Sequence, residues 1–190
     1  MTAAMYLPQF FVKQKLTLMV NRYEIYATTP DGNLGQLMAF AEQKRMAFRE
    51  EVTFFTDSTR TRKVFGFKAR KVIDLGSGYD ITDENGQPLG FFRKDFGASL
   101  LRSTFHLEGP GFAGTGQERN MVVSLLRRFT DIDFLPVHFD FVDAQTGAPL
   151  MSSTRRMSIG DRYTIDVPDQ RVDFRIAAAM AVGLDALMSR

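Results

Sequence analysis

Apolar and polar residues alternate with a period of two along most of this chain. In the first such run, residues 10–20, Phe10, Val12 and Leu16 share one side, and Gln14 is the polar exception among them. Later runs repeat the alternation, with apolar sides that carry Val52 and Phe54, then Phe65, Phe67 and Ala69, then Phe139 and Phe141, and finally Tyr163, Ile165 and Val167. Strands with one buried face and one solvent-exposed face show this pattern, which predicts an antiparallel sheet.

A weak internal repeat marks the turns between these strands. Residues 79–90 and 139–151 resemble each other, and residues 23–35 are a looser copy. Each copy has an aromatic residue at the start of a strand, then a tip rich in Asp, Asn and Gly, then a returning strand. Such tips supply the positive φ angles of tight turns, so the repeat predicts three β-hairpins.

The end of the chain departs from the alternation. Residues 169–188 have the pattern of a helix, and the stretch from Ile176 to Leu184 carries no charge before Asp185 interrupts it. A helix that is apolar on every side must be enclosed, but this stretch is far shorter than the roughly 18 residues that a bilayer span needs. We therefore expect the helix, with Asp169 as its N-cap, to lie inside the sheet.

One internal segment also favours a helix. Residues 115–118 have the form of a capping box, and apolar residues follow at helical spacing, so a surface helix is predicted over residues 116–129. The glycine-rich residues 109–116 lack both the third glycine of a dinucleotide fingerprint and a Gly-Lys-Ser/Thr sequence. They are interpreted as a hairpin loop that binds no nucleotide.

Composition narrows the class of protein. The chain has 190 residues, of which 44% are hydrophobic and 24% charged, which predicts one soluble domain over residues 1–190. Cysteine is absent, which excludes disulfides and agrees with a cytoplasmic location. We see no export signal and expect no transmembrane span. A net charge of +2 is too small to favour nucleic-acid binding.

Several stretches together resemble a known family. Residues 48–57, residues 64–70, the turn at residues 86–90 and the alanine-rich C-terminal helix resemble the LURP-one-related proteins, which belong with tubby C-terminal domains and phospholipid scramblases. The resemblance extends from about residue 6 to residue 188. It implies a mainly antiparallel β fold, α+β in class terms, in which a closed barrel of about twelve strands surrounds a hydrophobic C-terminal helix.

Candidate catalytic and metal-binding residues are few. His106 and His138 are the only histidines, and neither has a neighbour that suggests a nucleophile or a metal site. Scramblases carry a calcium-binding acidic segment before the terminal helix, and Asp166, Asp169 and Asp173 lie in the corresponding region. Pro168, Arg171 and Val172 interrupt this segment, so capping and a wet strand face explain the three carboxylates better. We expect a non-enzymatic protein without a cofactor.

Basic residues provide the best candidate surface. The candidates for lipid binding are Lys68, Arg70, Lys71, Arg93 and Lys94. Lys68 and Arg70 resemble the Lys-x-Arg pair with which tubby domains hold phosphoinositide head groups. Cations on an exposed strand also serve solubility, and nearby acids such as Glu51 are possible cross-strand partners.

The leading hypothesis is a barrel module that binds anionic phospholipid, peripherally at the membrane, or a protein partner through its outer surface. Two alternatives stay open: a scramblase-like membrane protein and a small-molecule carrier that uses the barrel lumen.

Overall fold

The computed structural model describes residues 4–16, 20–44, 51–70, 78–95, 103–119, 138–156 and 162–188. Within these ranges the chain forms twelve strands and one helix, labelled α2. The strands are β1 (Gln9–Leu16), β2 (Val20–Thr28), β3 (Leu34–Lys44), β4 (Glu51–Phe55), β5 (Lys63–Ala69), β6 (Tyr79–Asp83), β7 (Pro88–Asp95), β8 (Thr104–Gly109), β9 (Phe112–Glu118), β10 (His138–Asp143), β11 (Pro149–Arg156) and β12 (Arg162–Asp166), and the helix spans Phe174–Met188.

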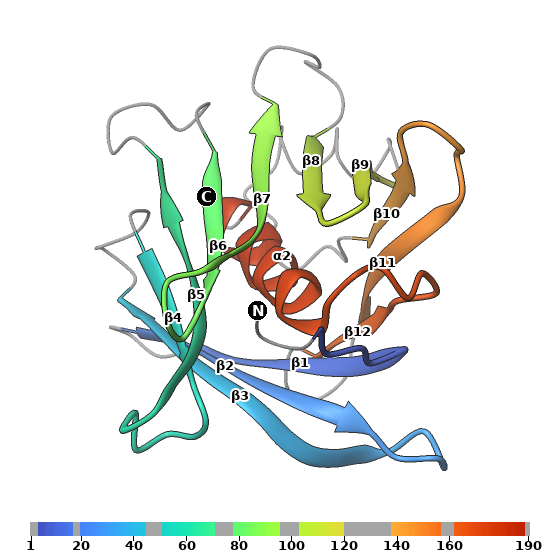
Figure 1. Ribbon diagram of the computed structural model, residues 1–190. Helices are drawn as coiled ribbons and strands as arrows, with labels where there is room; N and C mark the ends of the chain where they lie inside the picture. Colours follow the sequence, from blue (N-terminus) through green and yellow to red (C-terminus); the bar gives the residue numbers. More distant parts are fainter. Residues whose placement is uncertain are drawn as a thin grey trace, which may run out of the picture.

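The strands close into one antiparallel barrel. Each strand pairs with the strands that precede and follow it in sequence, and β12 completes the ring against β1. Figure 1 shows α2 running through the middle of this ring. The prediction of an antiparallel barrel of about twelve strands around a C-terminal helix is therefore confirmed.

The helix fits in the barrel because its residues are small. Ala177, Ala178 and Ala179 are fully buried. At Gly183, a Cβ atom would lie 2.8 Å from the ring of Phe92 on β7. A barrel of this strand number is too wide for its own inward side chains to fill, so the helix supplies the missing core.

Aromatic side chains fill the space between wall and helix. Phe54 and Phe65 stack with ring centroids 4.1 Å apart, and the ring of Phe10 meets that of Phe174 on α2 edge to face at 5.1 Å. The inward positions that the alternation predicts on β4, β5, β10 and β12 are buried, except that Ala69 is only partly so.

The three predicted hairpins are confirmed as β2–β3, β6–β7 and β10–β11. Gly32, Gly86 and Gly147 have φ angles of 75°, 79° and 71°, as tight turns require. The repeat also has a structural reason. Asp83 accepts hydrogen bonds from the backbone N–H groups of the tip that follows it, and Asp143 does the same at the corresponding position of its own hairpin.

The ladder between β3 and β4, which we call the β3–β4 joint, is short. Among the described residues, strands β3 and β4 pair at two positions, Phe40 with Phe55 and Ala41 with Phe54. For comparison, β1 and β2 pair at seven positions, from Phe10 to Leu16.

The predicted start of the C-terminal helix was wrong. The helix begins at Phe174, and its N-cap is Asp173, which accepts the N–H of Arg175 at 2.8 Å. Asp169 instead closes a separate turn, in which the N–H of Val172 donates to its carbonyl oxygen. Two successive Asp-x-Arg segments offer the same capping chemistry, and the helix starts at the second.

The predicted helix over residues 116–129 was wrong at its start. Residues 112–118 form β9, where Thr115 pairs with His106 on β8 and Glu118 with Phe139 on β10. Pairing on both sides overrides the local capping pattern. The predicted loop over residues 109–116 shrinks to a turn at residues 110–111 for the same reason. Residues 120–137 lie outside the described residues.

The first alternating run, predicted as one strand, belongs to two strands. β1 ends at Leu16 and β2 begins at Val20, and the two pair with each other. Residues 17–19 lie outside the described residues.

Candidate functional site

Two Asp-x-Arg units lead into α2 and use the same geometry. Arg171 donates its backbone N–H and its guanidinium to Asp169, and Arg175 does the same to Asp173, with backbone N–H to carboxylate distances of 2.9 and 2.8 Å. Arg171 also reaches Asp143 in the β10–β11 turn at 2.8 Å. Arg171 therefore connects the segment before the helix to the β10–β11 hairpin.

The pKa values at this end follow from the ion pairs. Hydrogen bonds to Asp169 and Asp143 raise the pKa of Arg171 above its ordinary value. Burial tends to raise the pKa of Asp173, but the bonds that this carboxylate accepts from Arg175 and from the N–H of Met5 outweigh burial and hold it below its ordinary value. Both carboxylates of the two units are therefore stabilised in the charged form.

Neutral side chains donate hydrogen bonds to Asp185 near the other end of α2. The carboxylate of Asp185 accepts hydrogen bonds from the amide of Gln14 at 2.6 Å and from the hydroxyl groups of Tyr23 and Tyr163, both at 2.7 Å. Burial and the nearby Asp185 raise the pKa of Tyr23 far above its ordinary value, so this phenol stays protonated. Gln14 and Asp185, each the polar exception in an apolar pattern, bind each other.

The basic candidates on β5 have acidic neighbours on the outer wall. Lys68 lies 3.7 Å from Glu51 on β4, and Arg70 lies 2.8 Å from Asp80 on β6. The guanidinium of Arg70 also covers the ring of Phe91 at 3.9 Å. The hydrogen bond to Asp80 raises the pKa of Arg70.

The remaining basic candidates that the structure describes, Arg93 and Lys94, lie on β7. Lys94 donates to the carbonyl oxygen of Leu187 at 3.2 Å, so it contacts the end of the enclosed helix. Arg93, the preceding residue, has the opposite orientation on β7 and lies across from His106 on β8. Lys71 lies outside the described residues.

The three acidic candidates also lie apart from one another in their contacts. Asp166 accepts a hydrogen bond from the amide of Gln9 at 2.6 Å, whereas Asp169 and Asp173 bind the arginines of their own units. Among the described residues, no three His, Asp or Glu side chains are placed to hold a metal ion together.

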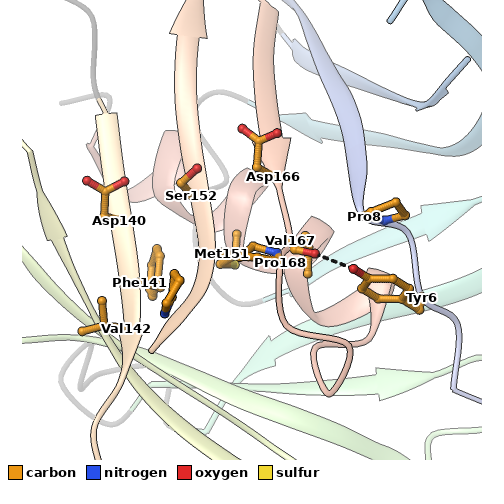
Figure 2. A pocket seen from close by; sticks show the side chains of 11 residues that line it. Tyr6, Pro8, Asp140, Phe141, Val142, Met151, Ser152, Asp166, Val167 and Pro168 are labelled. Carbon is orange, nitrogen blue, oxygen red and sulfur yellow. Dashed lines mark hydrogen bonds between the residues drawn. The ribbon is translucent and has the colours of Figure 1, made fainter. Parts of the chain in front are cut away.

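A groove with a volume of about 460 Å³ crosses the outer wall over β10, β11 and β12. Asp140, Ser152 and Asp166 form its polar row: Asp140 pairs with Ser152, and Ser152 pairs with Asp166. Figure 2 shows these three side chains pointing in the same direction from neighbouring strands.

An apolar rim borders the polar row. Val142 and Tyr6 are 40% and 36% exposed, and they are two of the three exposed large hydrophobic residues in the described part of the chain. The Tyr6 hydroxyl donates to the carbonyl oxygen of Val167 at 2.8 Å, which fixes this ring beside the groove (Figure 2). Rigid pyrrolidine rings, from Pro8, Pro149 and Pro168, complete the rim.

The two acids of the groove differ in their partners. Arg119 donates two hydrogen bonds to Asp140, at 2.7 and 2.5 Å, and holds its pKa below the ordinary value. The charge of Asp166, by contrast, meets only the neutral amide of Gln9 among the described residues. The groove therefore has one neutralised and one uncompensated carboxylate.

A protein-family model matches most of the chain. The model of the LURP-one-related proteins matches residues 37–185. The chain belongs to the LURP-one-related family. Together, this family and the twelve-stranded barrel around a helix fit a tubby-like module. A comparison with curated proteins gives no match.

Within the part of the chain that the structure describes, no helix combines the length and the apolar character needed to cross a membrane.

The sequence did not indicate the groove. Alternation placed Asp140 on the wet face of its strand, and Val142 follows on that same face as an apolar exception. This exposed apolar position was the signal in the sequence that could have indicated the groove. The convergence of Tyr6 with residues more than a hundred positions away depends on the closure of β12 against β1, which no local pattern reveals.

Proposed function

We propose that this LURP-one-related barrel is a non-catalytic binding module that binds a protein partner at the groove on its outer wall. The observation that supports this proposal best is the occupied lumen. From Phe174 to Asp185 every residue of α2 is buried, so the helix takes up the space that a carrier would need for a ligand. A partner then has the outer wall available.

The groove has the composition of a protein-binding surface. Exposed apolar residues beside a polar row are typical of places where another chain packs. Its strands are fixed by ladder pairing on both sides, and its rim carries three prolines, so little conformational entropy is lost on binding.

A selection with displayed random linear peptides on the full chain tests this function. We expect selected peptides to bind the wild type and to bind a Val142→Asp variant at least about tenfold more weakly, because a charge replaces an apolar contact. Leu34→Asp is the matched control, since Leu34 is also 40% exposed but lies at the start of β3. If no selected peptide distinguishes the two variants, the groove is not the binding site.

Peripheral contact of a cytoplasmic module with anionic phospholipid is the second candidate. Lys68 on β5 and Arg70, the residue directly after β5, have side chains that are 69% and 49% exposed. The pair Lys68–Glu51 is loose at 3.7 Å, so the lysine is free to turn to another anion. Each cation near an anionic surface contributes about 1 kcal/mol to membrane attraction.

Co-sedimentation with neutral and anionic vesicles separates the two candidates. Lipid binding predicts sedimentation with anionic vesicles only, reduced by Lys68→Ala combined with Arg70→Ala. Lys15→Ala is the control, because Lys15 pairs with Glu24 on a different part of the wall. Equal sedimentation with both vesicle types, or none, rejects the lipid candidate.

A further inference from the structure

We propose that the protein segment bound at the groove carries a lysine or arginine two residues from an apolar side chain, and that the cation binds Asp166. This inference rests on the proposed function and names the chemistry of the partner.

The charge of Asp166 is the first reason. Its Oδ1 atom accepts a hydrogen bond from the amide of Gln9, and no described side chain forms an ion pair with it. A cation adds a Coulomb attraction to the carboxylate that the neutral Gln9 amide does not supply. Ser152, the neighbour of Asp166 in the row, adds a hydroxyl group to this position.

The groove already contains an example of the contact. Arg119 binds the carboxylate of Asp140 with two hydrogen bonds, on the same outer wall and in the same row as Asp166. The geometry of this wall thus allows a guanidinium to lie against an outward carboxylate. Asp140 is neutralised in this way, which leaves Asp166 as the acid that a partner can pair with.

The spacing of the rows gives the second part of the inference. Val142 lies two residues beyond Asp140, and Pro168 lies two residues beyond Asp166, so the apolar rim runs about 7 Å from the polar row. In an extended segment, residues i and i+2 point to the same side at the same spacing. A segment with a cation at i and an apolar side chain at i+2, in either order, therefore matches both rows.

The open shape of the groove favours a polypeptide over an enclosed small molecule. Tyr6 and Val142 stand exposed at its border, so a ligand gains contact area by extending past the hollow. A passing chain can cover both residues while its side chains enter the groove.

The test uses the peptides selected by display on the full chain. We expect them to be enriched in Lys or Arg two positions from an apolar residue. Their affinity should fall about tenfold in Asp166→Asn and fall with added salt, because an ion pair is lost or screened. Glu108→Gln is the matched control, since Glu108 is an exposed carboxylate on β8, away from the groove.

The outcomes separate this inference from the proposed function. Enrichment of the cation together with loss of binding in Asp166→Asn supports the inference. Peptides that lose affinity in Val142→Asp but carry no cation, or bind Asp166→Asn as tightly as the wild type, overturn it and leave the protein-binding function standing. A selection that yields no peptide sensitive to Val142→Asp overturns both. Unchanged thermal unfolding of each variant shows that it is folded.

Discussion

The described side-chain contacts at the two ends of α2 come from different kinds of donor. At the start, the carboxylates of Asp169 and Asp173 are paired with arginines, and Arg171 extends the pairing to a hairpin tip. At the far end, Asp185 has two phenols and an amide as donors. Aspartates thus accept hydrogen bonds from arginines at one end, and at the other end the described donors to Asp185 include two phenols and an amide.

This difference shows how a barrel fixes a helix that it surrounds almost completely. Apolar packing alone leaves a smooth helix free to slide or rotate, whereas hydrogen-bonded groups have defined positions and directions. The two ends therefore set the depth and the rotation of α2, and the alanine-rich middle supplies the burial.

The largest expected effect comes from breaking the buried ion pair at the start of the helix. Arg175→Ala removes the partner of Asp173, whose side chain is 9% exposed, and leaves a buried charge. We expect the free energy of unfolding to fall by about 3 kcal/mol. Denaturant unfolding measures the change.

Arg171→Ala is the matched control for this prediction. It removes the same type of residue from the same motif, but the side chain of Arg171 is 42% exposed. The loss should be clearly smaller, because solvent replaces the ion pair. Equal losses in the two variants would show that burial does not distinguish the units.

A second prediction concerns the fit between helix and wall. Gly183→Leu places a side chain where even a Cβ atom would lie 2.8 Å from Phe92. Overpacking should lower the free energy of unfolding by about 2 kcal/mol. An unchanged denaturation midpoint would contradict the enclosed position of the helix. Ala186→Leu is a useful comparison, since Ala186 is only partly buried.

A smaller effect is expected from one neutral donor at the far end. Tyr23→Phe removes the hydroxyl group that donates to Asp185 at 2.7 Å and keeps the ring in the core. Loss of one buried hydrogen bond should cost about 1 kcal/mol in thermal or denaturant unfolding. A variant as stable as the wild type would mean that the remaining partners of Asp185 satisfy the carboxylate without this hydroxyl group.

The smallest expected effect is a dependence on pH that belongs to the start of the helix. Because the folded pKa of Asp173 lies below its unfolded value, its contribution to stability is present above that unfolded value, about 3.9, and is lost as the pH falls through the folded pKa. Unfolding measured from neutral to acidic pH should therefore show a shallower decline in Asp173→Asn than in the wild type. Parallel curves would exclude this carboxylate as a source of acid sensitivity.

Most of the barrel could be predicted from sequence because its determinants are local. Alternation identifies the inward residues of β4, β5, β10 and β12, and the hairpin tips carry their own glycines and acceptors. The failures have local causes as well. Thr115 and Glu118 have the spacing of a capping box, but pairing of β9 with β8 makes this segment a strand. Asp169 is as good a cap as Asp173, so the sequence alone does not show that the helix begins after Asp173.

The polar contacts of the lumen and the groove could not be predicted in the same way. Gln14 and Asp185 were visible as exceptions, but their pairing joins positions 171 residues apart. The row of Asp140, Ser152 and Asp166 depends on the register of three strands, and a shift by one residue would turn one of them inward. The local pattern shows which residues are unusual, but closure of the barrel determines which side chains they contact.

The short joint between β3 and β4 has a consequence for how the molecule fails. A ring of main-chain hydrogen bonds should open where the fewest of them must break, and among the described residues the β3–β4 ladder has two paired positions. When β3 and β4 separate, the barrel becomes an open sheet with two unpaired edge strands. Each edge strand can then pair with the same strand of another copy. The amide hydrogens bonded across the β3–β4 ladder should then exchange with solvent before those of the neighbouring ladders. Conditions that speed this exchange should also speed aggregation.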